Sequence, residues 1–354
     1  MNIVHLSNSI APRWQAGGPV RLFFDYVNEI SLDADLIIAV IGGVDEVKTN
    51  PYNTRVNYYP FKLKKIQFFG IKFFQISWLK LFSTLIKVGP EIIVLNELRG
   101  QNVLASLIYK LIFNRKVELR NVPCGHIVNT GKLTYKIHDI IVKIIGGNHI
   151  NYYAQNQLEL TILKERFINC KVLPLSIKLS GVKPRSEHLD SDFIRLISVG
   201  RNSLLKGFGD TLELIQASNL EISFTVMSLP SGDHDFYRMD VKYINADFTE
   251  SRFKTYKQYD IAILLPRICE QTSLGLLEFL SVGIPVIYNT NADMPYVDGV
   301  CGIRIPSNTR NPQILKYAIE KIQENYLEYS KNAVEVVYKH YNVERNARTL
   351  FSKN

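Results

Sequence analysis

The chain has little of what marks disulfide-stapled, metal-binding or membrane-spanning proteins. Four of its 354 residues are cysteine and they form no C-x-x-C pair, so we expect free, buried thiols and no metal site. Charged residues such as Lys80, Asp139 and Lys143 interrupt the longest apolar runs. These runs stay short of the ~20 apolar residues that a membrane-spanning helix needs. The opening MNIVHLSNSI lacks a basic segment and a cleavage site and reads as a strand, so we expect a cytoplasmic protein.

The remaining composition is that of a globular protein, with 46% apolar and 21% charged residues. A length of 354 residues exceeds what one hydrophobic core usually serves. We therefore expect two domains.

Acidic residues are unevenly distributed. Residues 1–178 contain 22 Lys/Arg and 12 Asp/Glu, whereas the remainder contains 20 and 21, so the first half holds the whole excess of the +9 net charge. No acid occurs between Glu46 and Glu91, where lysines alternate with aromatic residues over Lys62–Lys87. A helix of this kind fits peripheral contact with an anionic membrane, and a core-packing helix with a solvated lysine face explains it equally. Nucleic acid fits the charge but no binding motif accompanies it, so we expect no nucleic-acid partner.

Apolar runs of strand length alternate with amphipathic segments of helix length in the first half of the chain. The expected strands are Asn2–Ser7, Leu36–Val40, Ile92–Asn96, Val117–Asn121, Asn151–Ala154 and Val172–Leu175. The helices expected between them include Val20–Ile30, Gln101–Ile112 and Thr134–Ile145. This alternation predicts βαβ units around a parallel sheet. The polar stretch Leu179–Asp192 then indicates a linker.

A second series of the same kind follows the linker. Its expected strands are Ile194–Val199, Ser223–Met227, Val241–Ile244, Ile261–Leu265, Pro285–Tyr288 and Gly302–Ile305. Its expected helices are Thr211–Gln216, Ser273–Ser281, Pro312–Asn325, Tyr329–His340 and Val343–Ser352. The predicted fold class is α/β, with two Rossmann-like doubly wound domains. Ligands bind at the carboxyl ends of parallel strands, so two such units predict a cleft between them.

The segment after the first expected strand contains Gly17 and Gly18 just before a helix. A glycine pair there lets the backbone approach a ligand closely, and the helix N-terminus favours anions. A tight turn is the plainer interpretation. Arg21, one turn into the helix, either adds a charge-assisted contact or is solvated. The segment is not a G-x-G-x-x-G fingerprint, which disfavours an NAD-dependent oxidoreductase.

A second segment, V-G-R-N-S-L-L-K-G-F, begins at Val199 and places Arg201 and Lys206 on one loop after a strand. Two fixed cations there could offset the charge of a diphosphate leaving group. Two solvated loop cations are the alternative interpretation.

A third segment, Pro266–Ile287, contains Glu270 just before a helix and Glu278 on that helix. A carboxylate can accept hydrogen bonds from the vicinal hydroxyls of a ribose or hexose. One acid at a helix N-terminus and one solvated surface acid are the plainer interpretation. The strongly apolar surroundings of Glu278 disfavour a solvated role for it.

Together, E-x7-E followed by G-x-P-V-I, with V-G-R-x4-K-G about seventy residues earlier, resembles the retaining glycosyltransferases of family 4, which have the GT-B fold. The resemblance extends over most of the chain, including the N-terminal glycine pair and the closing helices. It implies an acceptor-binding domain at 1–178, onto which the helices at about 336–354 pack back, and a sugar-nucleotide-binding domain at 179–335.

The resemblance also implies catalytic roles for three residues. Arg201 and Lys206 would hold the donor diphosphate. Glu270 would contact the hydroxyls of the transferred sugar at the reacting face. The departing phosphate could itself take the acceptor's proton, so no resident cofactor and no divalent metal ion are expected.

The other donor-binding roles that the resemblance implies belong to the helix after Glu270 and to the first domain. Glu278 would bind the nucleotide ribose, and the backbone amides of Ser273 and Leu274 would contact the sugar or a phosphate. Gly18 would line the cleft from the first domain, with Gly17 and Arg21 as further acceptor or cleft candidates.

The sequence departs from the family's pattern at several positions. Gln271-Thr272-Ser273 replaces the usual Gly-Phe-Gly, which leaves the shape of the sugar pocket open. Cys124 stands where the family places a His or Arg, and His126 follows two residues on. His126 is therefore either a cleft candidate or an ordinary loop histidine.

The function that the resemblance implies is transfer of a hexose, with retention, from a UDP- or GDP-linked sugar to a glycan or lipid-linked saccharide. Such an enzyme would serve surface polysaccharide biosynthesis of the O-antigen or capsule type, at the inner face of the cell membrane. The alternatives are a sugar-nucleotide epimerase of the same fold and a non-catalytic sugar-nucleotide-binding protein.

Overall fold

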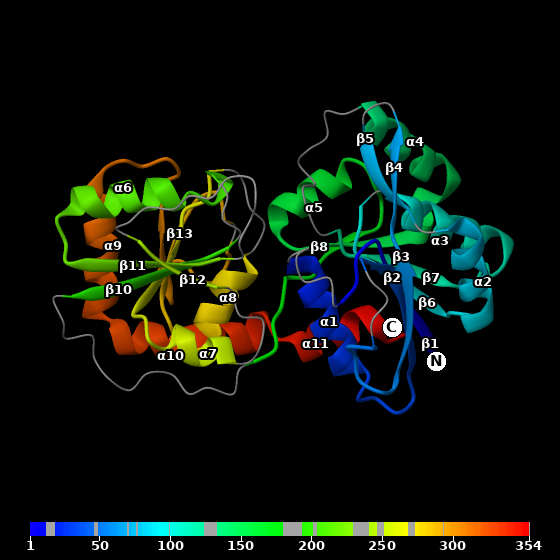
Figure 1. Cartoon of the computed structure of the whole chain (residues 1–354), viewed down its shortest axis with the longest axis horizontal. Helices are drawn as coiled ribbons and strands as arrows, with labels where there is room; N and C mark the ends of the chain where they lie inside the picture. The colour runs from blue at the N-terminus through cyan, green and yellow to red at the C-terminus, as the bar shows by residue number, and fades with distance from the viewer. Residues whose placement is uncertain are drawn as a thin grey trace. The chain divides into compact units, whose positions relative to one another are not determined.

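The computed structural model in Figure 1 describes residues 1–11, 18–45, 49–68, 71–75, 77–98, 100–123, 133–179, 193–200, 204–228, 241–245, 251–267, 273–292 and 294–353. The chain forms two compact units, Met1–Pro174 with Val343–Asn354, and Leu175–Asn342. The chain therefore leaves the first unit at Pro174 and returns to it at Val343. The boundaries expected from the sequence were 178 and about 336, whereas the two units divide at 174 and 343.

The first unit contains a seven-stranded parallel sheet of order β3-β2-β1-β6-β7-β8-β9. Its strands are β1 (Asn2–Ser7), β2 (Ile37–Val44), β3 (Val56–Lys62), β6 (Ile92–Leu95), β7 (Glu118–Asn121), β8 (Ile150–Ala154) and β9 (Cys170–Val172). The chain proceeds outward from β1 in one direction and from β6 in the other. The carboxyl ends of these two neighbours therefore form the topological switch point of this sheet.

Six helices described in the first unit cover the sheet: α1 (Gly18–Ile30), α2 (Trp78–Val88), α3 (Gln101–Ile112), α4 (Leu133–Gly146), α5 (Gln157–Lys164) and α11 (Val343–Phe351). Side chains of β1 alternate between the two faces of the sheet, as the strand period requires. His5 stacks on Phe23 of α1, with ring centroids 4.4 Å apart, whereas Val4 and Leu6 belong to the core cluster that includes Leu81 of α2. The two faces of the sheet therefore pack against different helices.

The last helix, α11, belongs to the first unit because buried polar groups tie it there. The guanidinium of Arg120, fully buried on β7, donates from Nη1 to the carbonyl oxygen of Thr349 at 2.9 Å. Asn346 donates from Nδ2 to the carbonyl oxygen of Pro174 at 2.6 Å. Leaving such groups unpaired would cost roughly 1–3 kcal/mol each.

One sequence expectation is wrong between β3 and α2. A basic, aromatic helix was expected over Lys62–Lys87, but the chain forms an antiparallel hairpin of β4 (Lys64–Phe68) and β5 (Ile71–Gln75), and helix begins only at Trp78. The segments KKIQF and IKFFQ place β-branched and aromatic residues at every second position, the period of a strand. The strand period therefore describes residues 64–68 and 71–75 correctly, whereas the charge pattern, from which a helix was expected, does not.

The second unit contains a six-stranded parallel sheet of order β12-β11-β10-β13-β14-β15. Its strands are β10 (Ile194–Val199), β11 (Ile222–Ser228), β12 (Lys242–Asn245), β13 (Ile261–Leu264), β14 (Val286–Asn289) and β15 (Gly302–Ile305). Helices α6 (Phe208–Ser218) and α9 (Pro312–Glu324) cover one face, and α7 (Ser251–Tyr256), α8 (Leu274–Ser281) and α10 (Tyr326–His340) cover the other (Figure 1). The switch point of this sheet lies at the carboxyl ends of β10 and β13.

The two parallel sheets with helices on both faces confirm the predicted fold class of two Rossmann-like domains. Strands β1, β10 and β15 and helix α3 have the bounds that the sequence pattern predicts. Among the described residues, no helix is long and apolar enough to span a membrane.

Candidate functional site

Two of the segments singled out in the sequence leave neighbouring strands of the second unit. The Lys206 loop follows β10 and the segment toward Glu270 follows β13, and these two strands pair with each other. Loops at such a switch point are where doubly wound sheets bind ligands. The structure therefore places side by side the chain segments that lead to the predicted cations and to the predicted Glu270. Arg201 and Glu270 themselves lie outside the described residues.

Lys206 ends a short 3-10 turn, Leu204–Lys206, that follows β10. Its aliphatic stem lies against Gly200, where an added Cβ would come within 3.2 Å of both Cδ and Cε of the lysine. The next residue, Gly207, has φ 69° and is the N-cap residue of α6, and a Cβ there would fall 2.0 Å from the carbonyl oxygen of Leu265. Only glycine combines this left-handed conformation with so close an approach. The backbone beside Lys206 is thus packed directly on the chain that leaves β13.

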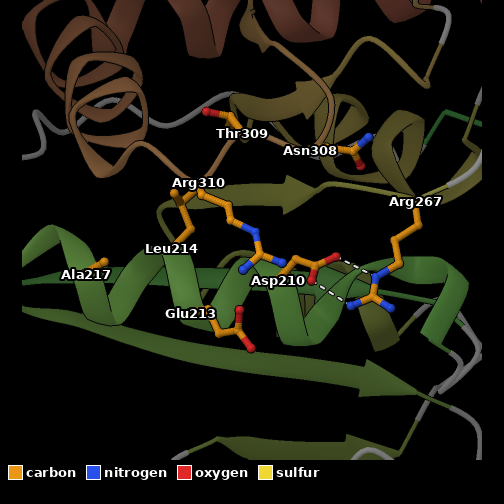
Figure 2. Close-up of a pocket in the computed structure, with 8 residues that line it drawn as sticks. All are labelled: Asp210, Glu213, Leu214, Ala217, Arg267, Asn308, Thr309 and Arg310. Atoms are coloured by element: carbon orange, nitrogen blue, oxygen red, sulfur yellow. Dashed lines mark hydrogen bonds and ion pairs between the residues drawn. The ribbon is translucent and has the colours of Figure 1, made fainter.

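Arg267 ties the same two loops together by its backbone and by its side chain. Its N–H donates to the carbonyl oxygen of Leu205 at 2.9 Å. Its Nε and Nη2 donate to the two carboxylate oxygens of Asp210 on α6, both at 2.6 Å, in the fork drawn in Figure 2. These hydrogen bonds hold the pKa of Asp210 below its usual value. A bidentate pair fixes orientation as well as distance, so the chain is anchored three residues before Glu270.

The residue before Arg267 is held from the opposite side. The carbonyl oxygen of Pro266 accepts hydrogen bonds from Nδ2 of Asn289 at 2.9 Å and from Nδ2 of Asn291 at 2.7 Å. Both donors come from the end of β14 and the turn after it. The start of the Glu270 segment is therefore fixed by three neighbouring strand ends.

A pocket lies beside the Asp210–Arg267 fork, between α6 and the loop after β15, and shares only Arg267 with the loop after β13 among the described residues. It is lined by Asp210, Glu213, Leu214, Ala217, Arg267, Asn308, Thr309 and Arg310 (Figure 2). Its two acids balance its two arginines, and none of the described donor-site candidates lines it. We therefore place the candidate site at the loops after β10 and β13.

The N-terminus of α8 provides backbone donors at the same strand ends. Ser273 is the N-cap residue and makes no side-chain capping bond. A Cβ added to Gly275 would lie 2.2 Å from Cγ1 of Val199, so the first turn of α8 packs on the last residue of β10. The first N–H groups of a helix have no partner within the helix and favour an anion. The two predicted backbone donors, Ser273 and Leu274, lie at this helix end.

Glu278 is buried on α8, as its apolar surroundings in the sequence indicate, with 8% of its surface exposed. Its Oε1 lies 3.2 Å from both Nε and Nη2 of Arg252, and its Oε2 accepts from the hydroxyl of Tyr256 at 2.9 Å. Arg252 in turn lies over the ring of Phe253, 4.1 Å from its centroid. The partners on α7 fix the orientation of this carboxylate. A carboxylate has about four acceptor positions, so these contacts are compatible with a ligand hydroxyl.

The described candidates of the first unit, Gly18 and Arg21, lie on α1, the helix that follows β1. Gly18 is the first residue of α1, and Arg21 on the same helix pairs with Asp25 at 3.8 Å. The Arg21 side chain is 15% exposed, and its contact with a ligand stays a prediction. Gly17 and His126 lie outside the described residues.

The sequence interpretation missed Glu97, which follows β6 at the switch point of the first sheet. Its Oε1 accepts from the backbone N–H of Asn8 and, at 3.3 Å, from the hydroxyl of Ser7, and its Oε2 accepts from Nδ2 of Asn102 at 3.0 Å. Burial raises the pKa of Glu97 to about 7. Glu97 thus joins the loop after β1 to the start of α3. An acid directly after the apolar run IIVLN is the signal that could have found it.

The cysteines and acids show no arrangement for a metal ion in the part of the chain that the structure describes, where no three His, Cys, Asp or Glu residues gather. Cys170 and Cys301 are free, and burial raises the pKa of the Cys301 thiol to about 12. Both are thiols in packed surroundings. Cys124 lies outside the described residues.

No family model and no curated protein sequence matches the chain. Among solved structures, it is similar to sucrose-phosphate synthase from Thermosynechococcus elongatus, with a TM-score of 0.72 and 15% identity over 99% of this chain and 97% of that one. It is also similar to Anabaena HepE in complex with UDP-glucose (TM-score 0.72, 14% identity, 98% and 97% covered). A third is the lipopolysaccharide outer core galactosyltransferase WaaB (0.67, 12%, 100% of both). The chain therefore has the two-Rossmann-domain fold of the GT-B glycosyltransferases.

Proposed function

We propose that the chain is a retaining glycosyltransferase of the family 4 type, which transfers a hexose from a UDP- or GDP-linked sugar to a saccharide acceptor. One observation carries the proposal: a lysine and a helix N-terminus converge on the carboxyl ends of β10 and β13. Lys206 stands on the loop after β10, and the first turn of α8 packs on Val199 at the end of the same strand. Both favour a phosphate group.

In the proposed reaction, the bond between the anomeric carbon and the diphosphate oxygen breaks and a bond to the acceptor oxygen forms on the same face. Lys206 and Arg201 offset the charge that develops on the leaving diphosphate. The acceptor's proton passes to an oxygen of the departing phosphate. Glu270 contacts the hydroxyls of the transferred sugar. No resident cofactor is required.

The nucleotide's ribose is assigned to Glu278. Its carboxylate is held by Arg252 and Tyr256, so its orientation is set before a ligand arrives. Preorganisation of this kind reduces the conformational entropy that is lost when the ligand binds. The second unit is then the donor-binding domain and the first unit the acceptor-binding domain, with Gly17, Gly18, Arg21 and His126 as candidates for acceptor binding.

We assign the enzyme to surface polysaccharide assembly in the cytoplasm, at the inner face of the cell membrane, with a glycan or a lipid-linked saccharide as acceptor. The names of two similar structures support this assignment, since one contains UDP-glucose and the other is a lipopolysaccharide galactosyltransferase. The basic first half of the chain supports contact with an anionic surface.

Thermal-shift measurements against UDP-, GDP- and ADP-sugars test the donor class. We expect stabilisation by UDP- or GDP-sugars, and NMR of the product formed on an added saccharide should show the anomeric configuration of the donor. An isomerised sugar nucleotide formed from donor alone would establish an epimerase instead. Binding without turnover on any saccharide would indicate a non-catalytic binding protein.

A further inference from the structure

Helix α4 of the first unit packs with its apolar side outward. Of its described side chains, only Val142 belongs to the core cluster. The other residues turned inward are polar: His138 accepts at Nε2 from the backbone N–H of Gly100 at 3.0 Å, and Asp139 pairs with Arg166 at 3.6 Å. An ordinary surface helix buries its apolar stripe and exposes its polar one.

The outward side of α4 is a continuous stripe of isoleucine. Its members and their exposed fractions are Ile137 (49%), Ile140 (56%), Ile141 (37%), Ile144 (78%) and Ile145 (38%). Spacings of three and four residues place these side chains on one side of a helix with 3.6 residues per turn. Isolated exposed isoleucines are common, but a full stripe is typical of an interaction surface.

The stripe continues onto the end of the neighbouring helix. A Cβ added to Gly146, at the end of α4, would lie 2.7 Å from a methyl group of Leu107 on α3. One turn further along α3, Leu111 and Ile112 are 39% and 70% exposed. We call the five isoleucines together with these two residues the α4 apolar surface.

Basic residues flank the α4 apolar surface. Lys136 and Lys143 are exposed and, by the helical period, lie along the edge of the isoleucine stripe next to Ile140. Arg115 and Lys116 are exposed just beyond the end of α3. Residues 98–158 contain eight Lys/Arg but only two acids, Glu118 and Asp139. Both acids are engaged, Glu118 with Arg120 and Asp139 with Arg166.

We propose that the α4 apolar surface docks on an anionic lipid bilayer. The combination of an apolar stripe with flanking lysines is that of helices that lie in the plane of a membrane interface. A second copy of this chain fits less well, because a symmetric contact would bring the same lysines against each other. The inference rests on the proposed function and deepens it by assigning the membrane contact to α4 rather than to the lysine-rich segment before α2.

Co-sedimentation of the full chain with phosphatidylglycerol vesicles tests this surface. We expect binding that weakens in 0.5 M salt and is at least tenfold weaker to pure phosphatidylcholine vesicles, because lysines contribute through attraction to anionic headgroups. The double variant Ile140→Gln/Ile144→Gln should bind phosphatidylglycerol at least tenfold more weakly. The double variant Lys136→Gln/Lys143→Gln should bind several-fold more weakly.

The matched control is Leu32→Gln/Ile37→Gln, which removes two exposed apolar side chains elsewhere in the same unit (64% and 52% exposed). It should bind vesicles like the unaltered chain. Equal vesicle binding by the Ile140/Ile144 variant, absence of vesicle binding by the unaltered chain, or a dimer that this variant dissociates would each overturn the proposal. The thermal shift with UDP- or GDP-sugars is measured on every variant, so a failure of donor binding is distinguished from a failure of docking.

Discussion

The backbone N–H of Arg267 donates to the carbonyl oxygen of Leu205 at 2.9 Å, so the loop that bears Lys206 and the loop that leads to Glu270 are one connected structure. The Arg267 side chain strengthens the connection through Asp210, and Gly207 permits it sterically. The Lys206 loop and the Glu270 segment, more than sixty residues apart in the sequence, are therefore held in a fixed arrangement relative to each other. Loss of the exposed Arg267–Asp210 ion pair should alter catalysis more than stability.

The first prediction concerns the fork itself. Arg267→Gln removes an ion pair whose side chains are 45% and 35% exposed, so unfolding free energy should change by less than about 1 kcal/mol. Turnover should fall about tenfold, because the Glu270 segment loses its anchor. Steady-state kinetics and urea unfolding measure the two effects. Arg304→Gln is the control, since Arg304 forms a similarly exposed pair with Asp298 at 3.5 Å. Turnover should fall more in Arg267→Gln than in Arg304→Gln, and equal losses would contradict a role of the fork in catalysis.

The second prediction distinguishes the steric clash of an added Cβ from the strain of a left-handed backbone conformation. Gly207 and Gly299 have nearly equal φ of 69° and 70°, but an added Cβ meets Leu265 only at Gly207, and nothing lies within 4 Å at Gly299. Gly299→Ala should cost about 1 kcal/mol of unfolding free energy, the strain of a left-handed alanine. Gly207→Ala should cost at least 2 kcal/mol more and reduce turnover. Equal costs in urea unfolding would contradict the close packing of the two loops.

Sequence periodicity could predict these strands and helices, because buried parallel strands and amphipathic helices leave regular apolar patterns. It could not predict the contacts of Arg267 or Asp210, because a hydrogen bond between loops after different strands leaves no periodic trace. Strand β3, Val56–Lys62, also escaped prediction: its alternation VNYYPFK is irregular and contains a proline, as edge strands often do. The charge pattern of Lys62–Lys87 favoured a helix where a hairpin forms.

The third prediction concerns the partners of Glu278. Tyr256→Phe removes the hydroxyl that donates to Glu278 at 2.9 Å, which leaves the carboxylate less well oriented. The donor KM should rise three- to tenfold with little change in kcat, since ribose binding is present in both ground and transition states. Tyr288→Phe is the control, because the Tyr288 hydroxyl is equally buried but donates to the carbonyl oxygen of Met294. A donor KM that moves equally in both variants would argue against a ribose role for Glu278.

The fourth prediction is a pH dependence of stability. Burial raises the pKa of Glu97 to about 7 from an ordinary 4.5, so the folded protein holds a proton that the unfolded chain releases between these values. The stabilisation is present below about pH 4.5 and is lost as pH rises to about 7, by up to about 3 kcal/mol. Urea unfolding at pH 5 and pH 7.5 should show a larger loss in the unaltered chain than in Glu97→Gln. A loss of the same size in both would mean that Glu97 does not titrate in this range.

The surroundings of Glu278 and Glu97 could also be predicted only in part from the sequence. The apolar run around Glu278 indicated burial, and burial is confirmed. Its partners Arg252 and Tyr256 lie on α7, a six-residue helix too short for a clear amphipathic period. Glu97 was missed because one acid after a strand is common, and only the sheet order places that strand at a switch point.

The most direct test of the donor site is isothermal calorimetry of UDP and GDP with Lys206→Ala, with Lys316→Ala on α9 as the matched control. Lys316 is an exposed lysine of the same unit that pairs with Glu320. We predict that Lys206→Ala binds the preferred nucleotide at least tenfold more weakly and turns over about 100-fold more slowly, while Lys316→Ala matches the unaltered chain. Unchanged nucleotide affinity and near-normal turnover in Lys206→Ala would contradict a donor site at Lys206.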